Sequence, residues 1–303
     1  MSESLTFAPL PSRALIAVAG PDWRDFLQGL ITQDVETLAP GEARFGALLT
    51  PQGRLLHDLF VIGRPKSQEG EGAWLDVLDE YRAAILQRLT MYRLRAKVEL
   101  AADETPVSIL FSAPPRAGGD PSGPSAAPAS AWIPAFAGTS GFVRDPRLAD
   151  LGWRGYGATM PAGAILAGED ARETQNLALG VPGPADWGCD KTYPIEANFD
   201  LLNGIDFKKG CFVGQETTSR MKRRGQIKSR MLPIVFEGPA PAPGAEVLVG
   251  DLRAGVVTSG GAGRAIALMR LDRAQAGGLT VEGRPVTVEQ PAWFLRALGA
   301  ELS

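Results

Sequence analysis

Cysteine and histidine are scarce in this chain of 303 residues, which contains only Cys189, Cys211 and His57 of these types. Two cysteines cannot form a disulfide framework, and three soft ligands are fewer than the four that a closed zinc site takes. An iron–sulfur cluster normally takes four thiolates, which the chain does not have. Any cluster that it holds must therefore be completed by a partner or by other kinds of ligand.

Long apolar runs are also missing. No run approaches the ~20 residues that cross a bilayer. The N-terminus lacks a basic segment followed by an apolar stretch, so no secretion signal is evident. We therefore expect a cytoplasmic location and no membrane partner. The net charge of −3 argues against broad nucleic-acid binding, which usually shows as a basic domain.

Positive charge gathers in one segment, residues 208–230, where eight basic residues stand against Glu216 alone. Cys211 lies in this segment between Gly210 and Gly214. Flanking cations favour the thiolate form of a cysteine, and so would a helix that began at Gly214. The two glycines let a ligand or partner approach the main chain closely. Cys211 is therefore a candidate nucleophile or metal ligand, although a free cysteine often packs as a small hydrophobe and a basic run is often a solvated helix face.

Apolar residues in the N-terminal part recur at spacings that predict both helices and antiparallel strands. A helix from Trp23 to Ile31 has Asp22 as its expected N-cap. The turn at residues 51–53 has proline and glycine at favoured places and predicts a hairpin. Strands and helices in this mixture, joined by hairpins, indicate an α+β fold and not a doubly wound sheet. The predicted strands are 45–50, 55–62, 74–78, 98–100 and 107–111, and a further helix is predicted at 79–94.

Composition changes twice along the rest of the chain. Residues 113–130 are almost entirely Pro, Ala, Gly and Ser and predict a flexible insertion, because such a segment cannot bury enough surface to order itself. A helix is expected at 170–179. Beyond the basic segment, short β-rich runs between Gly and Pro turns predict a small antiparallel barrel. We therefore expect an α+β region of two subdomains at 1–224 and a β-barrel domain at 225–303, with Cys211 near their seam, where ligand sites are common.

The segment around Cys211 also carries a family resemblance. Residues 209–216 read Lys-Gly-Cys-Phe-Val-Gly-Gln-Glu and, with Arg220 and Gly225 after them, closely resemble the K-G-C-[YF]-x-G-Q-E signature of the YgfZ family. Members of this family are folate-binding iron–sulfur assembly factors related to the glycine-cleavage T-protein. The likeness spans most of the chain outside the insertion, which makes it specific. Other stretches that look like the family pattern are 26–35, 52–54, 180–182, 194–198, 203–205 and 255–259.

The resemblance implies a T-protein-like ring of three subdomains that binds tetrahydrofolate. It also implies an accessory role in assembling or repairing iron–sulfur clusters, with no turnover required of the chain alone. In that role the Cys211 thiolate would be a redox-active group or a cluster ligand shared with a carrier or client protein. The amide-rich pterin of a folate suits carboxylates and amides, and its anionic tail suits Arg or Lys. By matching position, the expected folate contacts are Gln28, Thr32, Gln33, Asp34, Glu196, Asn198, Lys209, Gln215, Glu216 and Arg220, with Arg224 as an alternative for the tail.

Two departures separate the chain from the aminomethyltransferase that it is similar to. Where the T-protein has an acidic residue that touches the pterin, this chain has Ala178. No secure equivalent of the catalytic aspartate occurs in residues 77–84, where Asp79 more simply caps a helix. Because of these departures, tetrahydrofolate-dependent aminomethyl transfer or demethylation is the alternative function and not the first choice.

Three other features receive simpler interpretations. RNA binding through the basic segment is a third hypothesis, but few aromatic residues interleave with its charges to stack on bases. His57, alone on a predicted hairpin, is interpreted as structural. Cys189 lies outside the family signature and is interpreted as at most a second ligand.

Overall fold

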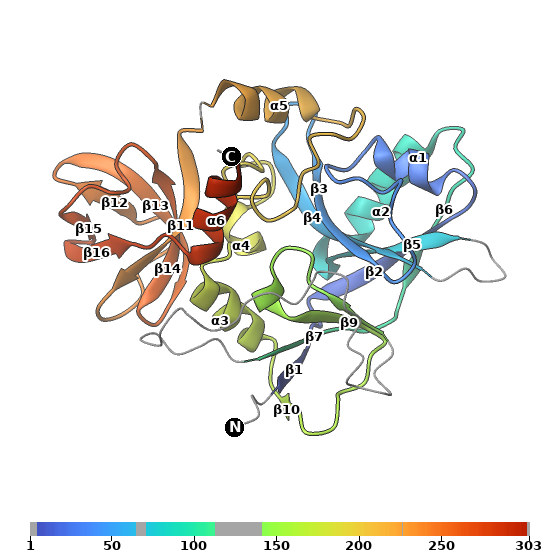
Figure 1. The fold of residues 1–303 in the computed structure, drawn as a ribbon, viewed down its shortest axis with the longest axis horizontal. Helices are drawn as coiled ribbons and strands as arrows, with labels where there is room; N and C mark the ends of the chain where they lie inside the picture. The colour runs from blue at the N-terminus through green and yellow to red at the C-terminus, as the bar shows by residue number, and fades with distance from the viewer. Residues whose placement is uncertain (1–4, 65–70, 113–140, 226, 302–303) are drawn as a thin grey trace. The chain divides into compact units, whose positions relative to one another are not determined.

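The computed structural model describes residues 5–64, 71–112, 141–225 and 227–301 (Figure 1). The predicted insertion at 113–130 lies outside the described residues. Among those described, no helix is long and apolar enough to cross a membrane. The chain divides into two compact units. The first unit comprises Met1–Gly29, Gln33–Phe45 and Leu59–Gln175, and the second comprises Leu30–Thr32, Gly46–Asp58 and Asn176–Ser303.

One five-stranded sheet of the first unit consists of β2 (Arg13–Ala19), β3 (Ala43–Leu49), β4 (Leu55–Gly63), β5 (Gly72–Leu78) and β6 (Glu99–Asp103). Their order across the sheet is β3-β4-β5-β2-β6. The ends of β3 and β4 that flank their connecting turn belong to the second unit. The hairpin predicted around residues 51–53 is thus confirmed.

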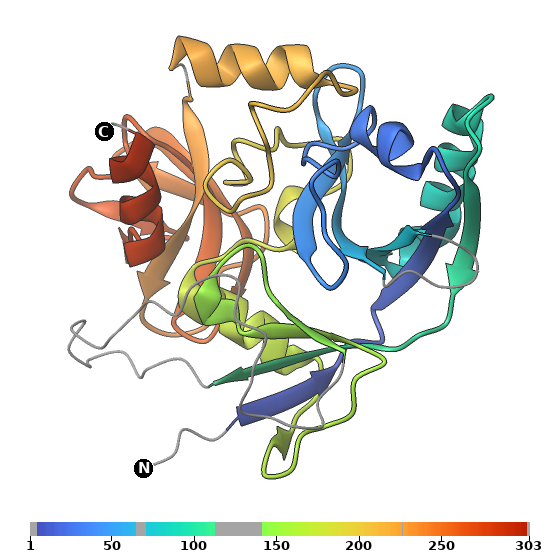
Figure 2. The same ribbon diagram turned by 45° about the vertical axis from the view of Figure 1, so that its right-hand side comes forward.

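Two helices accompany this sheet, and both were predicted from apolar spacing. Helix α2 (Asp79–Arg93) packs on β2, β5 and β6 (Figure 2). Its buried residues are Ile85 and Leu89. Helix α1 (Trp23–Gln28) is shorter than expected. Asp22 occupies the predicted N-cap position of α1, but its side chain does not cap the helix. Its carboxylate makes no cap hydrogen bond and instead accepts the Lys97 backbone N–H at 2.7 Å, a partner far away in the sequence.

A second five-stranded sheet of the first unit consists of β1 (Leu5–Pro9), β7 (Val107–Ser112), β8 (Phe142–Arg144), β9 (Trp153–Tyr156) and β10 (Ile165–Leu166). Its order is β10-β1-β7-β9-β8, with β1 and β10 parallel and the other neighbours antiparallel. Phe7, Leu110 and Phe142 form a buried apolar cluster on it. A short helix, η1 (Ala149–Leu151), precedes β9, and helix α3 (Asp170–Leu179) follows β10 with the predicted bounds.

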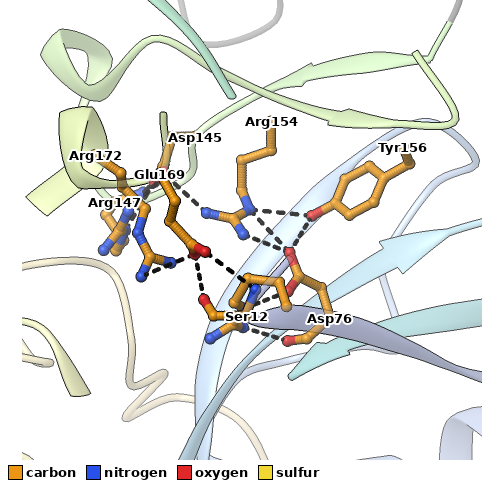
Figure 3. Close-up of polar contacts among 9 residues, drawn as sticks. Ser12, Asp76, Asp145, Arg147, Arg154, Tyr156, Glu169 and Arg172 are labelled. Atoms are coloured by element: carbon orange, nitrogen blue, oxygen red, sulfur yellow. Dashed lines mark hydrogen bonds and ion pairs between the residues drawn. The ribbon is translucent and has the colours of Figure 1, made fainter. Parts of the chain in front are cut away.

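A buried polar network connects the two sheets of the first unit (Figure 3). Asp76 on β5 is fully buried, and its carboxylate accepts hydrogen bonds from Arg13 of β2 at 2.6 Å and from Arg154 of β9 at 2.5 Å. The Tyr156 hydroxyl of β9 donates a third at 2.9 Å. Asp145, also buried, lies 3.7 Å from the Arg154 guanidinium. Because buried charges are costly unless they are paired and hydrogen-bonded, this network fixes how β9 faces β5.

Six strands of the second unit close into an antiparallel barrel, which Figure 1 shows in orange to red. The predicted small C-terminal barrel is therefore confirmed. Their order is β11-β14-β13-β12-β15-β16. The strands are β11 (Ser229–Phe236), β12 (Glu246–Val249), β13 (Leu252–Gly261), β14 (Arg264–Arg270), β15 (Leu279–Val281) and β16 (Arg284–Val288). The same unit contains helices α4 (Pro184–Trp187), α5 (Gln215–Arg224) and α6 (Ala292–Glu301). Neither β15 nor α6 was predicted.

Candidate functional site

Helix α5 begins directly after the signature segment. Gly214, at φ 82°, has a left-handed conformation and occupies the N-cap position, and the Gln215 N–H donates to the Phe212 carbonyl at 3.2 Å. Gly225, at φ 59°, ends the helix in the same conformation. Such backbone angles favour glycine, so the sequence specifies both ends of the helix. The prediction that Gly214 opens a helix is confirmed.

The start of α5 packs closely against the turn between β3 and β4. A Cβ atom added at Gly214 would lie 2.5 Å from the Thr50 carbonyl oxygen. One added at Gly53 would lie 2.8 Å from the Thr217 Cβ and 2.9 Å from the Gly214 carbonyl oxygen. Gly53 is also left-handed, at φ 85°. Two glycines therefore allow the turn and the helix to meet backbone to backbone, which places the signature segment.

Cys211 is exposed and lines an open pocket of about 790 Å³ in the second unit. Three other predicted site residues, Gln215, Glu216 and Arg220, line the same pocket. Pro51, Ser219 and Arg223 also line it and were not predicted as site residues. The lining residues are Pro51, Cys211, Phe212, Gly214, Gln215, Glu216, Ser219, Arg220 and Arg223. Helical spacing could have revealed Ser219 and Arg223. Together with Glu216 and Arg220 they recur every three or four residues on one face of α5.

The pocket carries net positive charge. Arg220 pairs with Glu216 one helical turn earlier, through exposed side chains. Arg223 is exposed and has no hydrogen bond or ion pair within the described part of the chain. Lys222 does not line the pocket, and its ammonium lies 3.9 Å from the Asp200 carboxylate. Two arginines against one glutamate beside a thiol form a site that suits an anionic ligand.

Lys209 supports the signature segment instead of entering the pocket lining. Its ammonium donates to the Ile31 carbonyl at 2.8 Å and lies 5.4 Å from the centre of the Phe212 ring. A lysine held in this way anchors the main chain next to Cys211. The side chain of the alternative residue Arg224 lies outside the described part of the structure.

Glu196 and Asn198, which were predicted from the resemblance, have different environments in the second unit. Asn198 is fully buried; its amide donates to the Met231 carbonyl at 2.7 Å and accepts from Arg230 at 3.1 Å. Glu196 is half-buried and accepts the Tyr193 N–H at 3.1 Å. Burial raises the pKa of Glu196, against the opposing effects of that hydrogen bond and of the Arg54 guanidinium. Glu196 thus keeps acceptor capacity for a ligand, whereas the Asn198 amide is engaged in the core.

The residues near α1 that were predicted to contact folate are hydrogen-bonded within the loop that follows this helix. Gln28 donates to Asp34 at 2.8 Å and accepts the Val35 N–H at 2.9 Å. Burial alone would raise the pKa of Asp34, but hydrogen bonds from Thr37 and Gln28 lower it overall. Gln33 accepts the Asp34 N–H at 2.8 Å. These side chains of the first unit therefore stabilise the loop, and a ligand contact would have to replace one of these bonds.

Thr32 belongs to the second unit and is fully buried. Its hydroxyl donates to the Gly204 carbonyl at 2.6 Å and accepts the Ala47 N–H at 2.9 Å. Cys189 is exposed, as Cys211 is, but it is absent from the pocket lining. The described residues contain no group of three or more His, Cys, Asp or Glu that could hold a metal ion.

Comparisons with known proteins give three kinds of match: a family model, similar sequences and a solved structure. A family model described as the CAF17 C-terminal beta-barrel domain matches residues 228–295. The mitochondrial iron–sulfur cluster assembly factor IBA57 of Mus musculus is 33% identical over 250 residues, covering 78% of this chain and 67% of that protein. The Homo sapiens protein of the same name is 33% identical over 270 residues, covering 81% and 73%.

Among solved structures, the glycine cleavage system aminomethyltransferase T from Bartonella henselae has a similar fold. The TM-score is 0.73 at 19% sequence identity, over 96% of this chain and 86% of that one. The expected T-protein-like α+β fold is thus confirmed. The expected cytoplasmic location is wrong, because the matching assembly factors are named as mitochondrial proteins. Absence of a secretion signal was too weak a basis for that prediction.

Proposed function

Because this chain belongs to the family of the IBA57 iron–sulfur cluster assembly factors, we propose that it assists cluster assembly through the sulfur of Cys211. The observation that carries this proposal is the exposed thiol in an open pocket at the start of α5, with Arg220 and Arg223 on the same wall. Thiolate sulfur is the usual ligand of iron–sulfur clusters. The cluster is the cargo of this reaction and not a resident group.

The ligand count of the chain supports a shared cluster. With two cysteines and one histidine in the whole sequence, Cys211 can supply one ligand and a carrier or client protein must supply most of the others. A cluster bound by several thiolates is anionic. The net positive pocket would stabilise such a complex electrostatically and speed its formation with an acidic partner. Arg220 and Arg223 therefore have a role beside the thiol.

We expect Cys211→Ala to reduce cluster transfer at least about tenfold, because the variant lacks the proposed ligand. Cys189→Ala is the matched control, since Cys189 is the other exposed free cysteine and lies outside the pocket. The measurement is visible absorption during anaerobic mixing with a cluster-loaded carrier. The proposal would be contradicted if Cys211→Ala transferred the cluster as fast as the wild type, or if both variants lost the same fraction of the transfer rate.

We also propose tetrahydrofolate as a ligand of the second unit. Glu196 supports this proposal, because a half-buried carboxylate with unused acceptor capacity suits the donor groups of a pterin. The proposed site leaves out two of the folate contacts that the family resemblance implied. Asn198 and Thr32 are fully buried, and their side chains are hydrogen-bonded to other parts of the second unit. The ligand would be a regulator or structural partner of the assembly factor.

Glu196→Gln is expected to weaken tetrahydrofolate binding about tenfold, because it replaces a charged acceptor by a neutral one. Calorimetric titration measures this change. Glu237→Gln, at an exposed position just after β11, is the control and should bind like the wild type. Unchanged affinity in the Glu196 variant would remove Glu196 from the site. One-carbon turnover with tetrahydrofolate that persisted in Cys211→Ala would instead favour the aminomethyltransferase alternative.

A further inference from the structure

Apolar side chains project into solvent where helix α2 ends. Leu94 is 88% exposed, Met91 63% and Tyr92 38%. Single exposed apolar side chains are ordinary, but three within four residues at one helix end form a patch. We call residues 88–97 the α2 tip. The tip lies wholly within the first unit, and none of its residues lines the Cys211 pocket.

The backbone of the α2 tip holds Leu94 in an unusual conformation. Leu94 follows the last residue of α2 and has φ 44° and ψ −105°. Positive φ is unfavourable for a branched side chain, and glycine would relieve the strain. The chain therefore keeps a leucine where both backbone strain and solvent exposure disfavour it. Strained positions of this kind often mark functional sites.

Positive charge surrounds the exposed apolar side chains. Residues 88–97 contain four basic residues and no acidic one, in a chain whose net charge is −3. Arg88 lies 5.4 Å from the centre of the Tyr92 ring, and Arg93 donates to the Val98 carbonyl at 3.3 Å. Arg95 and Lys97 have exposed side chains. The basic residues are Arg88, Arg93, Arg95 and Lys97.

The side chain of Asp22 contacts the backbone of the α2 tip. The Asp22 carboxylate accepts the N–H of Lys97 and so fixes the turn after α2, while the ammonium of Lys97 stays exposed. No ion pair of Arg95 or Lys97 occurs within the described part of the chain. Both cations are therefore available to an external anion. Leu94, Arg95 and Lys97 lie within four residues of one another directly after α2, so an apolar and an electrostatic contact would act at the same place.

We propose that the α2 tip docks on an anionic membrane surface. Leucine, methionine and tyrosine enter the boundary between headgroups and acyl chains, while arginine and lysine remain among anionic headgroups. Interfacial docking needs no spanning helix. The patch combines three exposed apolar side chains with four basic residues and no acidic one, which are the two features of an interfacial anchor. The acidic balance of the whole chain makes this local attraction necessary for approach to a negative surface.

Sedimentation with vesicles tests the proposal. The wild type should bind vesicles of phosphatidylcholine with phosphatidylserine and bind vesicles of phosphatidylcholine alone much less. Leu94→Gly should weaken binding about tenfold by removing the leucine side chain. The same change relieves backbone strain, so its thermal unfolding midpoint should equal or exceed that of the wild type. Replacing Arg95 and Lys97 by glutamine should weaken binding about fivefold for each charge removed, with less effect at high salt.

Leu252→Ser is the matched control, because Leu252 is 58% exposed and lies in the barrel. It should bind vesicles like the wild type. Loss of binding in Leu94→Gly, with normal stability and normal binding by the control, supports the docking role. Unchanged binding by Leu94→Gly, an equal loss in the control, or no binding of the wild type to anionic vesicles overturns it. Leu94-dependent binding to polyglutamate without vesicle binding would also overturn it and assign the tip to an acidic protein.

Discussion

Replacing Asp76 by alanine is expected to destabilise the protein by about 3–5 kcal/mol, the usual cost of breaking a buried ion pair by removing one partner. The Asp76 carboxylate accepts hydrogen bonds from Arg13, Arg154 and Tyr156, and both guanidiniums are almost fully buried. Alanine would leave two buried cations without their acceptor. It would also remove the carboxylate that joins the two sheets of the first unit.

Urea denaturation followed by tryptophan fluorescence measures this loss. Asp272→Ala is the control, because Asp272 is exposed and its carboxylate pairs with the exposed side chain of Arg270. Its unfolding midpoint should match the wild type, as expected for an exposed pair. Asp76→Asn keeps the shape of the side chain and should fall between alanine and wild type. A midpoint for Asp76→Ala equal to that of the control would show that the network contributes little.

The same network predicts how stability depends on pH. Burial alone would raise the pKa of Asp76, but Arg13 and Arg154 outweigh it and hold that pKa below the ordinary value of 3.8. Arg147 and Arg154 do the same for Asp145. A lowered folded-state pKa contributes stability that is fully present above the unfolded value and is lost as pH falls through the folded one. The difference between wild type and Asp76→Ala should therefore shrink as the pH falls below 3.8. A constant difference would exclude the ionised carboxylate as its cause.

Gly214→Ala is expected to destabilise the second unit by about 2–4 kcal/mol, because it combines backbone strain with overpacking. The added methyl group would occupy a left-handed position and lie 2.5 Å from the Thr50 carbonyl oxygen. The start of α5 would have to move away from the turn between β3 and β4. Since this contact places the wall of the Cys211 pocket, the proposed cluster transfer should fall together with stability.

Gly210→Ala is the matched control. Gly210 lies in the same signature, but a Cβ there would meet nothing within 4 Å. Thermal unfolding should separate the two variants. The rate of reaction of Cys211 with a thiol reagent, measured in a Cys189→Ala background, reports the pocket directly. Equal stability and equal thiol reactivity of the two glycine variants would contradict the proposed close packing.

Local sequence patterns predicted many of the elements because periodicity and turn residues act over a few residues. The spacing that buries Ile85 and Leu89 predicted α2, and the turn at residues 51–53 predicted the β3–β4 hairpin. The same logic failed for β15, which has three residues and is too short to show alternation. Local logic correctly placed Asp22 at the N-cap of α1, but it could not show that the Asp22 carboxylate accepts the Lys97 N–H.

The sequence by itself determined the signature around Cys211, the helix that starts at Gly214 and the shortage of ligands that requires a partner for any cluster. These depend on residue types and on neighbours in the chain. Only the tertiary structure decided that the turn at residues 51–53 meets α5 and that Asp76 binds arginines from two sheets. Such contacts join residues far apart in sequence. They follow from close packing and from the need to pair buried charge, and neither condition is written in local periodicity.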